Sequence, residues 1–491
     1  MKDKKNIISS FLVQIPTIIS GLIVPRLIIS AYGSEVNGLI SSITQILNFI
    51  TLLEGGLGAV VLAEYYKPIS DNNKKRVGEV YSACKSLFKK IGIIFILYTI
   101  LVGIIYPLII KSNFSYTYIM TLAFILSFSI LIQYLFSISL RLIIQAHQDI
   151  FVVNFTTALI LIINTVLVFI LIKIGCSIHI VKLFSAILFV LQPIIYSFYI
   201  KKYTSYSEYL KRNYKRIQFK NRWSGFSQNL AHFVNMNTDV ILITLICDLK
   251  SVSVYNIYML PMNALRQVII TFCNSMQSSL GNAVVSLSID DARKKYDEFR
   301  NLNLAISTFL FCPCLLLING FVSLYTIGVN DTNYYAPTFA VIMVLAQYLY
   351  CCRESDRFLI LASGKFKETN KCSIIEAIIN LTLSFALLKM GMGLIGVAIG
   401  TFVAILYRYI YFILFLKTNI IKESLYLQMK KIIPYFIVIL MNILIYLFVN
   451  LKTRNILDFC IYGVLFVLVN MVFMFIINFK MIRKYFKKKN K

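Results

Sequence analysis

Long apolar segments follow one another along almost the whole chain, and only short polar or charged loops separate them. A helix needs roughly 20 consecutive apolar residues to cross a bilayer, and most of these segments are longer. The pattern predicts about fourteen transmembrane helices, at residues 6–31, 36–66, 86–110, 117–146, 150–173, 178–199, 223–247, 252–281, 300–327, 335–361, 370–390, 393–416, 427–449 and 456–480. We therefore expect an all-α integral membrane protein, with some helices tilted or extended beyond the membrane.

Positive charge is distributed unevenly between alternate loops. With the N-terminus placed inside, the inner segments hold about 39 of the 49 Lys and Arg residues, and the outer loops hold about five. Lys and Arg collect in cytoplasmic loops because they resist translocation. The asymmetry does not invert anywhere along the chain, which predicts an even number of spans with both termini in the cytoplasm. The net charge of +28 is then a topology signal, and no nucleic-acid partner is expected.

A basic segment and a short repeat divide the predicted helices into two halves. The segment 201–222 carries eight Lys and Arg residues between the sixth and seventh helices. The sequence segments 55–61 and 278–284 resemble each other and lie six predicted helices apart. A repeat of six helices is typical of two halves related by an axis along the membrane normal. We expect an N-terminal six-helix half at 1–200, a cytoplasmic linker at 201–222, a C-terminal six-helix half at 223–416, and two extra helices with a basic tail at 417–491.

Composition limits the function classes further. The chain is 58% hydrophobic and 14% charged, whereas a soluble chain of this length needs more polar surface. The ten cysteines show no metal-ligand spacing, so we expect reduced, structural thiols and no metal. No phosphate-binding lysine loop and no nucleophile–base motif is present. We predict a protein that is not an enzyme and that needs no cofactor.

Polar residues recur at helical spacing within several of the apolar segments. Steps of three and four place such residues on one face of a helix. The seventh predicted helix carries Ser224, Gln228, His232, Asn235 and Asp239; the eighth carries Asn263, Arg266, Gln267, Asn274 and Gln277; the second carries Ser41, Gln45, Asn48 and Thr51; the first carries Gln14, Thr17 and Arg26. A single amide often binds a neighbouring helix, but stripes in the first and second helices of each half favour a shared wet cavity.

Charged residues inside the predicted spans are candidates for function, because lipid disfavours them. Arg26 and Arg266 suit an anionic ligand, since a guanidinium donates two hydrogen bonds to one phosphate. The alternatives are an Arg26–Asp239 ion pair and, for Glu54, a pair with Arg141 or Arg266. Glu54 and Asp239 are also candidates for ion coupling. For Arg408 we expect a snorkelling or gating role. For His232 we expect either a proton-carrying or a structural role.

Several short sequence features of the chain resemble those of a known family of membrane proteins. The features are Pro25-Arg26, Tyr32-Gly33, Asn37-Gly38 and the segments 55–58 and 66–71. Together with the topology they resemble the polysaccharide-transport branch, the Wzx-type flippases, of the multidrug/oligosaccharidyl-lipid/polysaccharide exporter superfamily. The similar sequence features lie mainly within residues 16–90, whereas the similarity in topology extends over the whole chain.

The resemblance implies a function. Such proteins move an oligosaccharide repeat unit, linked through diphosphate to a polyprenol, across the bacterial cytoplasmic membrane by alternating access, for O-antigen, capsule or exopolysaccharide synthesis. Arg26 and Arg266 would bind the diphosphate, and the sugars would meet Gln45, Asn48, Gln228, His232, Asn235, Asn263 and Gln267. The implied partners are the lipid-linked oligosaccharide, H⁺ or Na⁺, and a polysaccharide polymerase and glycosyltransferases.

Three alternative functions remain open from the sequence. A drug or cation antiporter of the same superfamily typically carries an acid in the first helix, where this chain has Arg26. A peptidoglycan-precursor flippase shares the fold and also uses basic residues in helices one and eight. A membrane polysaccharide polymerase, which is a different class, needs a larger outer loop than the short ones predicted here.

Overall fold

The fold is known from a computed structural model, which describes residues 2–54, 57–203, 214, 219, 237–286, 288–421, 423–448 and 455–489. All regular structure within these ranges is helical, which confirms the predicted all-α class. The chain separates into two compact units, Met1–Ser253 and Val254–Lys491. The domain boundaries expected at 200, 222 and 416 stay a prediction.

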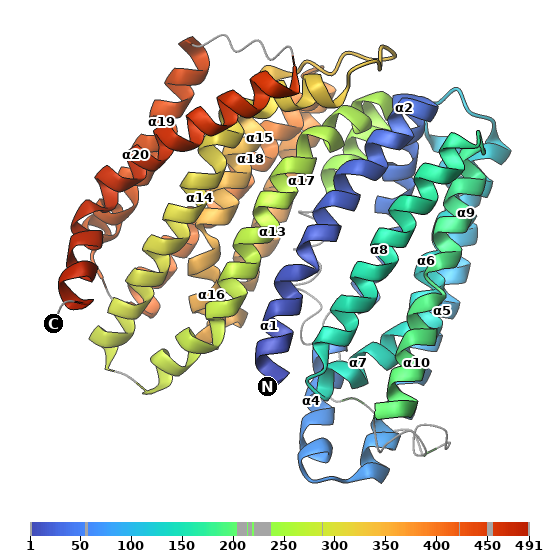
Figure 1. Cartoon of the computed structure of the whole chain (residues 1–491), viewed down its shortest axis with the longest axis horizontal. Helices are drawn as coiled ribbons and strands as arrows, with labels where there is room; N and C mark the ends of the chain where they lie inside the picture. The colour runs from blue at the N-terminus through green and yellow to red at the C-terminus, as the bar shows by residue number, and fades with distance from the viewer. Residues whose placement is uncertain are drawn as a thin grey trace. The chain divides into compact units, whose positions relative to one another are not determined.

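The first unit consists of long helices with several short ones between them (Figure 1). In chain order these are α1 (Lys2–Leu12), α2 (Gln14–Leu47), η1 (Asn48–Ile50), α3 (Thr51–Glu54), α4 (Leu57–Ser70), α5 (Lys74–Ile109), α6 (Tyr116–Ile132), the π-helix η2 (Gln133–Ser137), α7 (Ile138–Ala146), α8 (Ile150–Lys173), α9 (Ile178–Leu188) and α10 (Leu191–Tyr203). A further helix spans Asn237–Ile246. Figure 1 shows α9 beside α6 and α8, and α6 also packs on α5.

A glycine separates the first two expected membrane helices. Gly33 lies inside α2 with φ 86° and ψ 172°, a backbone conformation that is almost restricted to glycine because a Cβ clashes there. α2 is therefore two helical segments, one before and one after Gly33. The break expected between residues 31 and 36 is confirmed.

Other expected helices are interrupted where the hydropathy pattern showed one continuous segment. The second expected helix, 36–66, changes at Asn48 to a 3₁₀ turn and continues through α3 and α4. The fourth, 117–146, contains the π-helix η2, and the sixth, 178–199, is broken at Phe189 and Val190 between α9 and α10. The hydropathy pattern did not predict these interruptions. They arise from changes in backbone hydrogen bonding, which leave side-chain hydropathy unaltered.

Apolar side chains of α2, α5 and η2 form the centre of the first unit. Leu39, Ile43, Phe88 and Phe95 are completely buried, with Tyr134 beside them. This packing joins elements that are far apart in the sequence, and it fixes the position of η2 against α5.

Polar contacts join α8 to the start of the chain. Asn6, Ser9 and Ser10 of α1 bond residues near the start of α8, and Thr165 donates to Ser20 of α2 at 2.9 Å. Lipid tails are as apolar as the helix surfaces, so the hydrophobic effect does not drive membrane helices together. Hydrogen bonds of this kind therefore help to hold them in place.

The second unit begins within α13 (Leu249–Ser286). It continues through α14 (Ile289–Tyr325), α15 (Pro337–Cys352), α16 (Glu354–Ala362), η3 (Lys365–Thr369), α17 (Asn370–Lys389), α18 (Gly393–Asn419), α19 (Leu425–Phe448) and α20 (Ile456–Lys489). α18 packs on α15 and α17, while α14 packs on α15, α19 and α20. The 37 residues of α14 would span about 55 Å, which is longer than a hydrocarbon core of roughly 30 Å.

Ten helical stretches among the described residues are long and apolar enough to cross a membrane. The first of them, Lys5–Ile50, includes the turn at Gly33 and thus two of the expected helices. The seventh expected helix falls largely outside the described residues, and α13 and the α15–α16 pair are not among the ten. The chain is a multi-pass membrane protein, and the count of fourteen spans stays a prediction.

Candidate functional site

Seven charged side chains meet inside the second unit, and we call them the ionic cluster. They come from α14, the turn between α15 and α16, α16 itself, α17 and α18. The members are Arg300, Arg353, Glu354, Asp356, Arg357, Glu376 and Arg408. Such a group in a membrane helix bundle is costly unless its charges are paired, and the pairing is extensive.

Glu376 of α17 accepts hydrogen bonds from two arginines at once. Arg353 donates to one carboxylate oxygen and Arg408 of α18 donates to the other. The side chains of Glu376 and Arg353 are 1% and 2% exposed. Charge-assisted pairs of this geometry are strong when water is excluded, so Glu376 links α17 to both neighbouring helices. Arg408, at 13% exposure, is therefore an ion-pair partner of Glu376, and its expected snorkelling or gating role stays a prediction.

Arg300 and Asp356 form a second buried pair. Arg300 Nε lies 3.5 Å from Asp356 Oδ1, and the side chains are 1% and 0% exposed. Tyr296, one turn before Arg300 on α14, donates its hydroxyl to the same oxygen at 2.6 Å. Spacing of four residues places Tyr296 and Arg300 on one face of α14, which explains why a single carboxylate receives both.

Glu354 and Arg357 complete the ionic cluster at its rim. Arg357 Nη2 lies 2.7 Å from Glu354 Oε2, and the Arg357 side chain is 32% exposed whereas that of Glu354 is buried. The guanidinium also lies 4.3 Å from the centre of the Phe358 ring. This arginine is the member that still reaches solvent or a ligand.

Arg266 of α13 adjoins the ionic cluster through an aromatic ring. Its guanidinium carbon lies 5.4 Å from the centre of the Tyr350 ring, and that of Arg353 lies 4.5 Å from the same ring. Arg266 Nη1 also donates to Gln347 Oε1 at 3.2 Å. With Arg266, five arginines lie among the three carboxylates of the ionic cluster, so this region carries a positive surplus, which favours an anionic ligand.

The two other predicted residues on α13 lie on its exposed side. Asn263 and Gln267 are three residues before and one after Arg266, and both are exposed. Spacing of three to four residues gives one helix face, so they border the surface on which Arg266 emerges. The structure leaves their amides accessible, and their predicted contact with sugars stays a prediction.

The predicted residues of the first unit lie on α2 and the short helices that follow it. Arg26 follows Pro25 and is half-buried, with its Nη1 atom enclosed by protein. Gln45 and Asn48 are half-buried near the end of α2, where the backbone oxygen of Asn48 accepts from Thr51 Oγ1 at 2.7 Å. Their predicted roles in binding are untested.

Glu54 has defined partners in the first unit. Its Oε2 accepts from the Tyr134 hydroxyl at 3.1 Å, and its Oε1 lies 3.7 Å from Arg141 Nη2. Of the two pairings expected for Glu54, the one with Arg141 is the one found. Asp239, in the helix Asn237–Ile246, is buried at 3% exposure. Three further predicted residues, Gln228, His232 and Asn235, lie outside the described residues.

The ionic cluster is what the sequence analysis missed. Arg353 and Arg357 lie near the inner end of the span expected at 335–361, where Lys and Arg are common in membrane proteins. Two signals were available: the charged stretch 353–357 inside an apolar segment, and Glu376 within the span expected at 370–390. These residues can be recognised as partners only when it is known that α18 packs on α15 and α17. A single sequence does not contain that information.

Comparisons with known proteins were made for the sequence and for the fold. No protein-family model matches the sequence, and no curated protein matches it significantly. Among solved structures, a lipid II flippase, MurJ, in an inward closed conformation matches with a TM-score of 0.68 and 17% identity, over 97% of this chain and 99% of that one.

Multidrug transporters match over a smaller share of the chain. An inward-facing multidrug resistance transporter of the MATE family, in the MOP superfamily, has a TM-score of 0.64 and 14% identity over 84% of this chain and 99% of its own. The MATE multidrug transporter DinF-BH has a TM-score of 0.59 and 16% identity over 86% and 97%. The chain thus has the fold of the membrane transporters and flippases of the MOP superfamily.

Proposed function

We propose that this chain is a flippase for polyprenyl-diphosphate-linked oligosaccharides in bacterial surface-polysaccharide synthesis. It moves the glycan and its diphosphate from the inner to the outer leaflet of the cytoplasmic membrane by alternating access, with both termini in the cytoplasm. The observation that carries the proposal is the positive surplus at Arg266 and the ionic cluster, in a chain whose fold matches that of a lipid II flippase.

The chemistry of the cargo suits these residues. A diphosphate needs cations, and arginine binds phosphate through two parallel hydrogen bonds. Arg266 on α13 and Arg26 on α2 are the proposed diphosphate ligands. Sugar hydroxyls need amides, which Asn263 and Gln267 offer on the exposed side of α13. The apolar polyprenyl chain stays in the membrane during the movement.

The share of the fold that matches favours a flippase over a drug antiporter. The lipid II flippase matches 97% of the chain, whereas the two MATE transporters match 84% and 86%. A surplus of arginine also suits an anionic lipid better than the cationic compounds that acidic cavities attract. Coupling to H⁺ or Na⁺ at Glu54 or Asp239 and cooperation with a polymerase and glycosyltransferases are further parts of the proposal.

Reconstitution into vesicles tests this function directly. The purified chain is placed in liposomes that contain a fluorescent glycan on polyprenyl diphosphate, and a reductant that does not cross membranes destroys the fluorescence of the outer leaflet. The expected result is loss of nearly all fluorescence, against about half in protein-free vesicles. Two further probes, lipid II and a cationic rhodamine dye, are compared at equal protein density. Movement of the dye without either lipid would assign drug export instead, and glycan polymerisation would assign a polymerase.

A further inference from the structure

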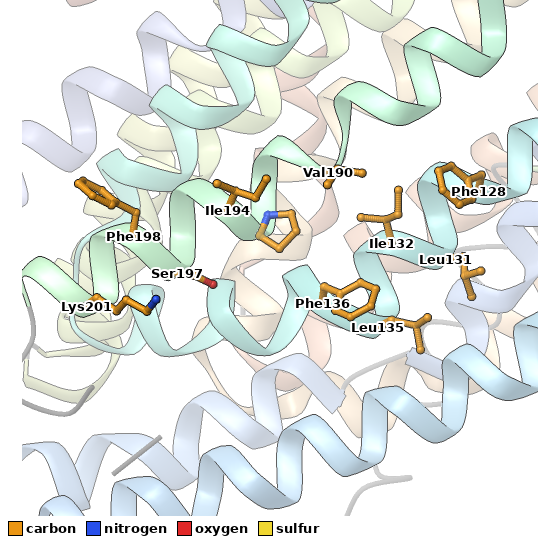
Figure 2. A pocket seen from close by; sticks show the side chains of 11 residues that line it. Phe128, Leu131, Ile132, Leu135, Phe136, Val190, Ile194, Ser197, Phe198 and Lys201 are labelled. Carbon is orange, nitrogen blue, oxygen red and sulfur yellow. The ribbon is translucent and has the colours of Figure 1, made fainter. Parts of the chain in front are cut away.

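A groove in the first unit is lined by α6 and η2 on one side and by the α9–α10 turn and α10 on the other (Figure 2). Its volume is about 680 Å³, and eleven residues line it. All of them are apolar except Ser197 and Lys201. We call it the α6–α10 groove.

The groove exists because both of its walls depart from regular α-helix. The π-helix η2 (Gln133–Ser137) follows α6, and the turn at Phe189 and Val190 separates α9 from α10. A π-helix widens the backbone locally and is frequent at functional sites. Two regular helices would close against each other through their side chains, whereas these two leave a space between them.

The rim of the α6–α10 groove is apolar and open. Phe136 is 56% exposed, Ile194 56% and Phe198 64%. Both walls belong to stretches that are long and apolar enough to cross a membrane, Tyr116–Ala146 and Ile178–Lys202. An apolar space of this kind gives water too few hydrogen-bonding partners, so a hydrocarbon chain is the occupant that it suits.

Lys201 lies at one end of the groove and Phe128 at the other, as Figure 2 shows. From Val190 to Lys201 the wall rises about 16 Å along α10, at 1.5 Å per residue. That is about half of a hydrocarbon core of roughly 30 Å. The groove is therefore about one leaflet deep, and its lysine is placed where lipid headgroups begin.

We propose that the α6–α10 groove binds one acyl chain of an anionic phospholipid, whose phosphate contacts the ammonium group of Lys201. The depth of one leaflet matches a phospholipid tail, while a polyprenyl chain of cargo length would extend beyond it. Lys201, a cation in the lining at the headgroup end, supplies charge complementarity. This lipid site is formed by residues of the first unit alone, and the inference does not depend on the proposed function.

The site is tested by counting lipids retained on the purified, full-length protein by native mass spectrometry, after exposure to vesicles of phosphatidylglycerol or phosphatidylcholine. Wild-type protein is expected to retain one phosphatidylglycerol in preference to phosphatidylcholine. Lys201→Ala should weaken that binding about fivefold, the share of one basic residue near an anionic surface. Lys75→Ala is the control, since it removes the same charge from an exposed position of α5 that does not line the groove, and it should leave retention unchanged.

A second pair of variants fills the groove instead of removing its charge. Ile194→Trp should abolish retention, whereas Ile187→Trp on α9, which does not line the groove, should not. Gel filtration of each variant shows whether the fold is kept. Equal retention of both phospholipids, wild-type retention by Lys201→Ala, or displacement of phosphatidylglycerol by polyprenyl phosphate would each overturn the proposal, and the last would assign the groove to the cargo's tail.

Discussion

Glu376→Gln is a substitution from which the structure predicts a large loss of stability. The change keeps the size of the side chain but removes the charge that Arg353 and Arg408 share. Arg353 is 2% exposed and Arg408 13%, so neither gains water in compensation. Removal of one partner from a buried pair costs about 3–5 kcal/mol, because the other charge stays buried and uncompensated.

The expected loss converts into a measurable shift of the unfolding temperature. Each kcal/mol lowers Tm by about 2–4 °C in a domain the size of the second unit, so Glu376→Gln should unfold about 6–20 °C below wild type. A thiol-reactive dye suits the assay, because six cysteines, Cys84, Cys273, Cys312, Cys351, Cys352 and Cys372, are buried and react only on unfolding.

The control is a pair of the same chemistry at the surface. Arg76 and Glu79 are 42% and 22% exposed, and exposed pairs contribute about 0–1 kcal/mol. Glu79→Gln should therefore change Tm by at most a few degrees. If both substitutions shifted Tm equally, Glu376 would not be the central acceptor of the ionic cluster, and the reasoning from burial would be refuted.

Two glycine substitutions test the helix geometry by the same thermal assay. Gly33→Ala should cost about 1–3 kcal/mol, because the φ and ψ at this position strain any other residue, whereas Gly21→Ala, which has no atom within 4 Å of an added Cβ, should be neutral or stabilising. Gly400→Ala should cost about 1–3 kcal/mol through overpacking, since its Cβ would lie 2.1 Å from Ser384 Oγ. Gly463→Ala meets only an ordinary contact at 3.8 Å and serves as its control; equal effects within either pair would contradict the packing described.

The hydropathy pattern was sufficient to locate most membrane helices because burial in lipid constrains every residue of a span. It predicted α8 at residues 150–173 with both ends correct. The C-terminal end is well defined because Gly175 follows with φ 82°. It did not predict η2 or the α9–α10 turn. Both interruptions change which backbone groups pair, and the side chains through them, although they include Gln133 and Ser137, do not break the apolar segments.

Part of the candidate site could also be predicted from the sequence, because lipid disfavours charged residues within a span. Arg266 was recognised because lipid would reject it, and the structure adds Tyr350 and Gln347 as its neighbours. The pairing of Glu376 with Arg353 and Arg408 depends on the neighbourhood of α15, α17 and α18. A charge near the end of an apolar segment has the same sequence pattern whether it reaches water or a buried partner, and only packing distinguishes the two.

The measurement that tests the central claim most directly is the rate at which vesicles with Arg266→Ala move the lipid-linked glycan. Loss of a charge-assisted contact to diphosphate should slow the movement about 10- to 150-fold, and Arg266→Lys should recover part of it, since lysine keeps the charge without the planar fork. Lys389→Ala, which removes an exposed cation at the end of α17, should move the lipid at the wild-type rate. Movement by Arg266→Ala at the wild-type rate would contradict the account, because the cargo's diphosphate would then not need the arginine on which the proposal rests.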